Sequence, residues 1–190
     1  MKITRMLLLV GMLLLSTTGF GGNQADNNNQ IDKTIKVVAP QRPAGQKDVL
    51  ALRCDPIKTV RIGFVGLGAR GTEAVRRFTY QKNIEVVALC DLHQWRVDSC
   101  QRMLQRAGMP RAARYYGAED AWKKLCQRKD IDLVYIATDW VNHAPIMLYA
   151  MENGKHVACE VPAALTLDEI WKVVDTAERT RRHCMMLENC

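Results

Sequence analysis

The sequence predicts one α/β domain with a doubly wound fold, in which helices cover both faces of a parallel sheet. From residue 59 onward, short apolar runs alternate with segments of helical spacing. The apolar runs are continuous, as is typical of parallel strands that are buried on both faces. The chain has 190 residues, 48% of them hydrophobic, which suffices for one ordinary domain and a tail but not for two domains.

The predicted elements follow in order along the chain. The first strand is VRIGFVG at 60–66, and it leads into a helix over 69–80. The second strand, IEVVALCD, ends at Asp91. A helix over 94–107, a connecting stretch at 108–117 and a third helix over 118–128 come next. The alternation then repeats, with strands at 131–138, 155–161 and 183–187 and with helices at 143–154 and 166–180.

The N-terminus predicts export. Lys2 and Arg5 precede an apolar run at 6–15, and small and polar residues follow. This pattern is typical of a secretory signal, which we place at residues 1–22, so the protein is expected in the periplasm or outside the cell. A run of about ten residues is too short for a stable membrane span, which needs about twenty. An uncleaved anchor is the alternative, because no clean A-x-A cleavage site is visible.

Residues 23–58 are rich in Asn, Gln, Pro and Gly and show no sustained apolar period. We interpret them as a flexible N-terminal arm. The globular part then covers residues 59–190.

Charge and cysteine content exclude two classes of function. The formal net charge is +7, but the basic residues are scattered over several predicted helices, which favours a solvated surface and no nucleic-acid partner. None of the seven cysteines forms a C-x-x-C pair, so we expect no metal site. Cys90 and Cys159 close apolar runs and are interpreted as core residues.

Three glycines form a G-x-G-x-x-G motif between the first strand and the first helix. This context is the one that the dinucleotide fingerprint requires. Gly66 allows a tight turn, Gly68 lets a diphosphate approach the backbone, and Gly71 lets helix and strand pack closely. The phosphates would meet the free N–H groups at the helix N-terminus.

An acidic residue follows at the spacing expected for ribose recognition. Asp91 ends the second strand, about twenty residues after Gly71. Its carboxylate can accept hydrogen bonds from the adenosine ribose and would repel a 2′-phosphate, so NAD is favoured over NADP. Capping of the next helix is the alternative role. Arg96 leaves some room for NADP.

Later strand ends supply further candidates at the same sheet edge, where ligands of open α/β sheets gather. The fourth strand is followed by ATDWVNHAP, and Trp140, Asn142 and His143 are expected to line the nicotinamide half. The alternative is that Asp139 or Asn142 caps the next helix and that Trp140 serves packing. The next strand brings Glu160 and Val161 to the edge, and the last one brings Glu188 and Asn189.

The segments GLGARG, WVNH, GKHVACEVPAA and HCMMLENC together resemble the N-terminal half of the glucose-fructose oxidoreductase and inositol dehydrogenase superfamily. In detail they are similar to the NAD-dependent glycoside hydrolase family 109, known for α-N-acetylgalactosaminidases. The resemblance runs from about Thr59 to Cys190. The oxidoreductase members typically carry E-K-P at the strand end, with the lysine near the reacting carbon. Here Val161 replaces that lysine, as in the hydrolase branch.

The resemblance implies a set of contacts with NAD. It also implies a second domain, absent from this chain, that binds an amino-sugar glycoside and supplies most acid and base residues, so the catalytic residues stay unknown. His143 is an alternative acid or base, but cofactor contact is favoured. The implied NAD contacts are made by Ala69, Arg70, Asp91, Trp140, Val141, Asn142, His143, Glu160, Val161 and Asn189.

The activity that the resemblance implies is a glycosidase with a closed redox cycle. In such a cycle the sugar is oxidised at C3, the C1 substituent is eliminated, water adds, and the hydride returns. Because NAD is regenerated in each turnover, an exported enzyme needs no free pool of it. We expect the NAD-binding half of such an enzyme. A sugar or polyol dehydrogenase and a truncated, non-catalytic nucleotide-binding module are the alternatives, and a homo-oligomer is left open.

Overall fold

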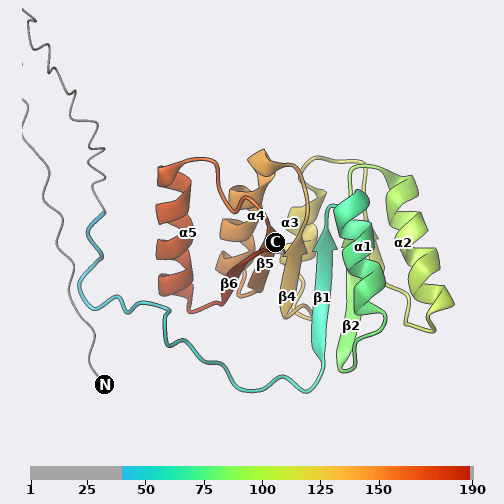
Figure 1. Cartoon of the computed structure of the whole chain (residues 1–190), viewed down its shortest axis with the longest axis horizontal. Coiled ribbons are helices and arrows are strands. Elements are labelled where there is room, and N and C mark those ends of the chain that lie inside the picture. The colour runs from blue at the N-terminus through green and yellow to red at the C-terminus, as the bar shows by residue number, and fades with distance from the viewer. Residues whose placement is uncertain (1–39, 189–190) are drawn as a thin grey trace, which may run out of the picture. The chain divides into compact units, whose positions relative to one another are not determined.

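The computed structural model describes residues 40–188 (Figure 1). The predicted signal at 1–22, the arm before residue 40 and Asn189 lie outside this range. Six parallel strands form one sheet in the order β3-β2-β1-β4-β5-β6, which confirms the predicted doubly wound fold. The strands are β1 (Val60–Val65), β2 (Ile84–Cys90), β3 (Ala113–Tyr115), β4 (Leu133–Ile136), β5 (His156–Glu160) and β6 (Cys184–Leu187).

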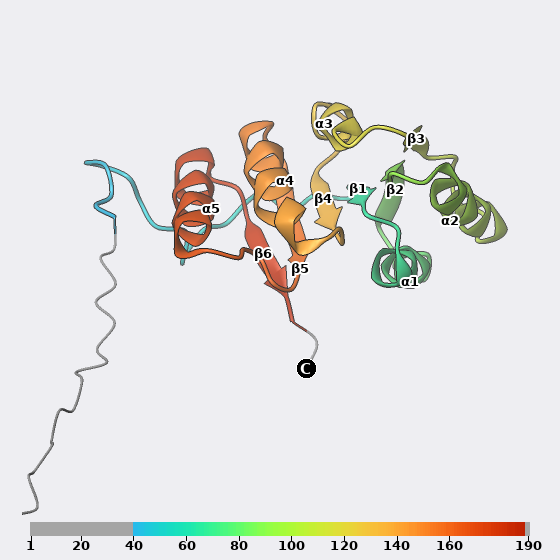
Figure 2. The same ribbon diagram turned by 90° about the horizontal axis from the view of Figure 1, so that it is seen from above.

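Five helices cover the two faces of the sheet. Figure 2 shows α1 and α2 on one face and α3, α4 and α5 on the other. Each face has its own apolar core, because every buried strand places alternate side chains on opposite sides. The helices are α1 (Ala69–Phe78), α2 (Gln94–Arg106), α3 (Ala121–Cys126), α4 (Trp140–Glu152) and α5 (Leu167–Thr180).

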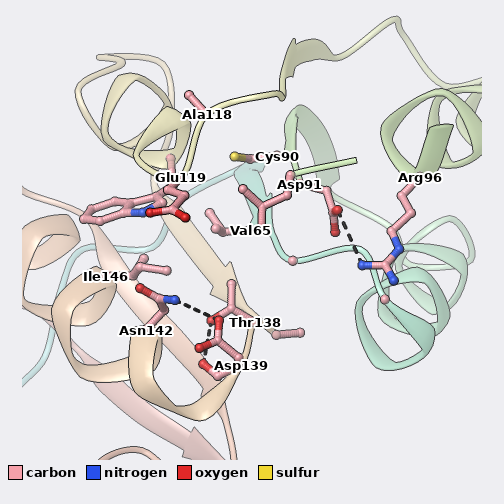
Figure 3. A pocket seen from close by; sticks show the side chains of 15 residues that line it. Val65, Cys90, Asp91, Arg96, Ala118, Glu119, Thr138, Asp139, Asn142 and Ile146 are labelled. Atoms are coloured by element: carbon pink, nitrogen blue, oxygen red, sulfur yellow. Dashed lines mark hydrogen bonds and ion pairs between the residues drawn. The ribbon is translucent and has the colours of Figure 1, made fainter. Parts of the chain in front are cut away.

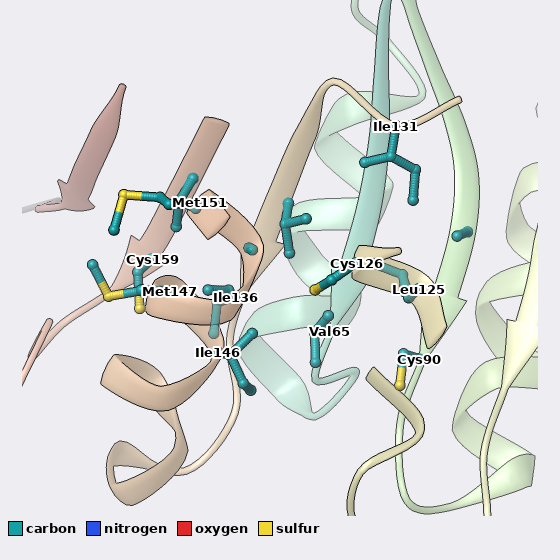
Figure 4. Close-up of a cluster of buried hydrophobic side chains, with 14 of the residues drawn as sticks. Val65, Cys90, Leu125, Cys126, Ile131, Ile136, Ile146, Met147, Met151 and Cys159 are labelled. Atoms are coloured by element: carbon teal, nitrogen blue, oxygen red, sulfur yellow. The ribbon is translucent and has the colours of Figure 1, made fainter. Parts of the chain in front are cut away.

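The core beneath α3 and α4 contains several of the cysteines (Figure 4). Cys90, Cys126 and Cys159 are buried there among Val65, Ile136 and other aliphatic side chains. Burial raises the pKa of these three thiols to about 12. They therefore pack as small apolar groups, as the sequence predicts.

Specific capping interactions define both ends of α5, the last helix. Thr166 precedes α5, and its hydroxyl accepts the backbone N–H of Glu169 at 3.2 Å. The Glu169 carboxylate accepts the Thr166 N–H in return at 3.1 Å, which completes a capping box. The helix stops at Arg181, which adopts a left-handed conformation with φ 54°.

The largest differences between the structure and the sequence prediction lie at β3 and at the starts of α3 and α4. The stretch at 108–117 contains β3, a three-residue strand that pairs only with β2 at the sheet edge and is too short for a periodic signal. Helix α3 begins at Ala121 instead of residue 118. Helix α4 begins at Trp140, three residues before the predicted start, and includes Pro145, which removes one intrahelical hydrogen bond.

The segment 40–58 forms turns and bends without a helix or strand, and its side chains bond to α5. Arg42 Nε donates to both oxygens of the buried Glu178 carboxylate, at 2.9 and 2.8 Å. Gln46 donates to Asp175 and Glu178, each at 2.9 Å. The hydrogen bond from Arg42 holds the pKa of Glu178 below its usual value. Within residues 40–188, no helix has the length and apolarity needed to cross a bilayer.

An ion pair ties β1 to the start of β4 at the edge opposite the candidate site, and it supports a stability prediction. Asp132 accepts the Arg61 backbone N–H and Nε, each at 2.9 Å, and Nη2 at 2.7 Å. These bonds lower the pKa of Asp132. Asp132→Asn is expected to reduce the free energy of unfolding by about 1.5–3 kcal/mol at pH 7, the usual contribution of hydrogen bonds to a charged group.

The pH dependence checks the cause. Because the folded-state pKa of Asp132 lies below its ordinary value of 3.8, its contribution is complete above that pH and is lost as pH falls through the folded pKa. Urea unfolding at pH 7 and pH 3 should therefore show a smaller gap between variant and wild type in acid. Asp168→Asn is the control, because its ion pair with Lys172 is exposed on a helix surface and should contribute little. An equal loss at both pH values would contradict this account.

Candidate functional site

A cavity of about 530 Å³ lies where β1, β2 and β4 end, beside the N-terminus of α1 (Figure 3). Four of the predicted contact residues line it, which are Gly66, Gly68, Asp91 and Asn142. The carboxyl ends of parallel strands are where open α/β sheets bind ligands. The sequence-predicted glycine loop, ribose residue and β4 end therefore meet at one place.

Two glycines of the loop are required by the packing of the chain itself. Gly66 has φ +88°, and a Cβ there would lie 2.3 Å from the carbonyl oxygen of Ala137. A Cβ on Gly71 would lie 1.9 Å from the carbonyl oxygen of Gly66. Both distances are far inside van der Waals contact. These residues therefore make the tight turn and the close approach of α1 to the end of β1.

In contrast, the packing of the chain does not require a glycine at position 68. Its φ of −65° suits any residue, and a Cβ there would meet nothing within 4 Å. It lines the cavity and precedes α1, whose start has no side-chain cap and no acidic residue in its first turn. Ala69 and Gly71 lie in the first turn of this helix, and the N–H groups of a first turn find no acceptor within their own helix. An anionic diphosphate fits this arrangement, since it needs close access to the backbone.

Asp91 supports the loop and faces the cavity at the same time. Its Oδ2 accepts the Leu67 N–H at 2.7 Å, and its Oδ1 accepts the His93 N–H at 2.9 Å. Each carboxylate oxygen has a further lone pair that can accept a ribose hydroxyl. His93 is the N-cap of α2 and this cap has no side-chain hydrogen bond, so Asp91 holds the residue before the helix and does not itself cap α2.

Arg96 lies beside Asp91 at the rim of the cavity. Its Nη1 is 3.5 Å from Asp91 Oδ1, and its guanidinium lies 5.2 Å from the centre of the Trp95 ring. The arginine therefore neutralises part of the Asp91 charge while remaining in place through two contacts. The Asp91 carboxylate remains at the end of β2, where its negative charge disfavours a 2′-phosphate.

Glu160 lies on the other face of the sheet, toward α1. Tyr135 Oη donates to its Oε1 at 2.6 Å, and Arg70 Nε lies 3.4 Å from its Oε2. Burial, and then the hydrogen bond to Glu160, raise the pKa of Tyr135, so the hydroxyl remains a donor. The β5 end is thereby linked to the first turn of α1, in which Arg70 is the second residue.

The remaining candidates occupy different environments. Trp140 and Val141 are exposed in the first turn of α4, and Val161 is half-buried after β5. His143 is buried, with Nδ1 2.7 Å from the carbonyl oxygen of Pro162 and Nε2 3.2 Å from that of Thr138. His143 therefore ties the ends of β4 and β5 together and is not among the residues that line the 530 Å³ cavity.

Glu119, Trp122 and Tyr135 are among the residues at or near the site that the sequence prediction lacks. Glu119 and Trp122 line the cavity from the start of α3. Recognising β3 would have revealed them, because residues that follow a strand end lie at the same sheet edge. Tyr135 is hidden in the apolar run of β4, where only its hydroxyl marks it as different.

Comparison with known proteins identifies the domain. Residues 60–188 match the model of an oxidoreductase family described by its NAD-binding Rossmann fold. The chain belongs to this family. It is thus an NAD-binding module, with NAD as its cofactor, as the sequence predicts.

Curated relatives carry the name that the sequence resemblance suggests. Glycosyl hydrolase family 109 protein 1 of Bacteroides fragilis is 60% identical over 161 residues, which are 85% of this chain and 35% of that protein. The protein of that name in Bacteroides thetaiotaomicron is 55% identical over 183 residues, 96% of this chain and 38% of that protein. A glycosyl hydrolase family 109 protein of Porphyromonas gingivalis is 52% identical. The chain thus spans little more than a third of their length.

Solved structures share the fold. The WlbA dehydrogenase of Chromobacterium violaceum, solved with NADH and UDP-GlcNAcA, has a TM-score of 0.60 at 19% identity, covering 72% of this chain and 37% of that one. An NAD-binding oxidoreductase of Klebsiella pneumoniae has a TM-score of 0.54 at 27% identity, covering 68% of this chain and 34% of that one.

The two glycines at the helix start yield a paired prediction. Gly68→Val should abolish NAD retention but leave the fold intact, because the new side chain enters only the space that the diphosphate needs. Gly71→Ala should instead lower the melting temperature, since its Cβ would collide with a backbone oxygen. Mass spectrometry of nucleotide released on denaturation, together with thermal unfolding, measures both effects. Unchanged NAD content in Gly68→Val would refute the phosphate-loop assignment.

Tyr135 and Glu160 are expected to act as one unit in NAD binding. Tyr135→Phe keeps the ring, which stacks on Phe64 at 5.0 Å, and removes only the hydroxyl. Tyr135→Phe and Glu160→Gln should each weaken NAD binding about tenfold, which corresponds to the loss of one hydrogen bond to a charged group.

A double-mutant cycle tests this coupling. The double variant should lose little more affinity than either single variant. Tyr149→Phe is the control, because its hydroxyl accepts from Gln127 on the other face of the sheet. Additive losses in the calorimetric dissociation constants would show that the two residues act independently.

Proposed function

We propose that this chain is the NAD-binding half of an exported glycosidase that hydrolyses α-N-acetylgalactosaminides. The 52–60% identity to proteins named glycosyl hydrolase family 109 carries the proposal. The identities to the solved dehydrogenase and NAD-binding oxidoreductase structures are much lower, at 19% and 27%.

The end of β5 supports the hydrolase over the dehydrogenase. Val161 follows Glu160, and by the resemblance given above this is the position at which the oxidoreductase members typically carry a lysine. A valine side chain cannot take or give a proton, so a simple dehydrogenase step would lack its usual acid or base here. His143 does not replace it, since both ring nitrogens face backbone carbonyl oxygens.

In this proposal the chain holds NAD tightly through complete turnovers. When bound, NAD⁺ accepts a hydride from the sugar and gives it back in the same turnover, so the net reaction is hydrolysis. The α1 N-terminus binds the diphosphate, and Asp91 binds the adenosine ribose. Tyr135 and Arg70 keep Glu160 in place at the nicotinamide end. A cofactor that never needs exchange suits a protein with a predicted export signal.

The sugar and the acid–base residues have a different source in this proposal. The matched segment is 35% of the Bacteroides fragilis protein. We assign sugar binding and proton transfer to the further length that such relatives have. The residues of this chain bind and orient the cofactor.

Hydrolysis without added cofactor is the test of the proposal. The full reading frame should release N-acetylgalactosamine from its α-glycosides with no NAD added and should contain stoichiometric NAD after dialysis. In D₂O the product should carry deuterium at C2, because elimination removes the hydrogen there and solvent restores it. A direct displacement would leave C2 unlabelled.

The Gly68→Val variant of the same protein is the matched control. It should be folded, free of NAD and inactive. Turnover that depends on added NAD⁺, with a keto-sugar as product, would refute the glycosidase and indicate a dehydrogenase.

A further inference from the structure

The cavity continues past the glycine loop and Asp91 toward α3. Its far wall is formed by Glu119 and Trp122 at the start of α3 and by Asn142 and Ile146 of α4 (Figure 3). If the diphosphate binds at Gly68 and the ribose binds at Asp91, the adenine base must occupy the end of the cavity near α3. This position of the adenine base rests on the placement of NAD in the proposed function.

The polar groups of this far wall are hydrogen-bond acceptors. Asn142 Nδ2 donates to Asp139 Oδ1 at 2.8 Å, which leaves the amide oxygen of Asn142 turned into the cavity (Figure 3). The Glu119 carboxylate points into the same space and can only accept. Within residues 40–188, no hydrogen bond or ion pair engages this carboxylate.

The apolar part of the wall is flat and fixed. Trp122 packs edge-on against Tyr149, with ring centroids 5.4 Å apart and planes at 85°. Lys123 Nζ lies 5.7 Å from the centre of the Trp122 ring. Ile146 is fully buried beside it. A planar aromatic base suits such a wall, because stacking on an aromatic side chain stabilises any base.

The two acceptors distinguish among bases. Adenine carries a 6-amino group with two hydrogens, whereas hypoxanthine and guanine carry an acceptor oxygen at the same position. We infer that Glu119, together with the amide oxygen of Asn142, recognises the 6-amino group of the adenine of NAD. Asn142 is thereby assigned to the adenosine half instead of the nicotinamide half expected from the sequence. Glu119 is thus a specificity-determining residue for the cofactor.

Deamino-NAD, the hypoxanthine analogue of NAD, is the probe. It differs from NAD on the outer edge of the base, where oxygen replaces the 6-amino group and N1 gains a hydrogen, so the glycine loop and Asp91 treat both alike. The 190-residue chain should bind NAD about 10- to 100-fold more tightly than deamino-NAD, because the analogue opposes oxygen to oxygen. Calorimetric titration of nucleotide-free protein with each dinucleotide measures this ratio.

Two variants test whether Glu119 determines the preference for NAD over deamino-NAD. Glu119→Ala should lower the ratio severalfold, mainly by improving deamino-NAD relative to NAD, and the amide oxygen of Asn142 should maintain the remaining preference. Asp120→Ala is the matched control, since this neighbouring carboxylate pairs with Lys123 at 3.7 Å and is not among the residues lining the 530 Å³ cavity. It should keep the wild-type ratio. Thermal unfolding of each variant verifies the fold.

The outcomes separate this inference from the proposed function. NAD and deamino-NAD binding with equal affinity to the wild-type chain would overturn the role of Glu119 while leaving the NAD site standing. An unchanged ratio in Glu119→Ala would do the same. Failure of the folded chain to bind either dinucleotide would overturn the proposed function and this inference with it.

Discussion

The close contact between Gly71 and the carbonyl oxygen of Gly66 is the constraint on which the site depends. With a would-be Cβ at 1.9 Å from that oxygen, the first turn of α1 lies directly against the turn that ends β1. This contact fixes the helix N-terminus at the carboxyl edge of the sheet, beside the cavity that Gly66 and Gly68 line. The anion site is therefore a consequence of how tightly helix and strand pack, and it requires no basic side chain.

A second coupling between fold and function runs through Asp91. One carboxylate accepts backbone N–H groups from the glycine loop and from the start of α2, at 2.7 and 2.9 Å, and also lines the cavity. The ribose acceptor and the shape of the phosphate loop are thus set by the same group. Changes at Asp91 will therefore alter loop geometry as well as cofactor preference, and NAD affinity alone will not separate the two effects.

The sequence predicts the framework of the domain better than the direction of its side chains. Continuous apolar runs in the sequence predict five of the six strands. The sixth strand, β3, has no such run, and it forms by pairing with β2. Glu119 and Trp122 gain their positions from that short strand, so the far wall of the cavity could not be predicted. The sequence predicts that Glu160 and His143 both lie at the carboxyl edge of the sheet. Strand alternation turns Glu160 toward α1, and the start of α4 turns His143 inward to two carbonyl oxygens. Position along the chain identified the edge, whereas tertiary contacts decided the face.

The bridge formed by Arg70, Glu160 and Tyr135 explains how one rigid edge can serve both ends of a dinucleotide. Arg70 belongs to the first turn of α1, which is proposed to bind the diphosphate. Glu160 ends β5, which lies two strands away from β1 in the sheet. Because burial and its carboxylate neighbour raise the pKa of Tyr135, its hydroxyl keeps donating throughout the neutral pH range. The link forms without a bound ligand. In the proposed cycle, a hydride must leave the sugar and return to it, so both transfers need the same geometry. The hydrogen bonds along this edge form before the cofactor binds. The binding geometry is therefore preorganised, and little conformational entropy is lost when NAD binds.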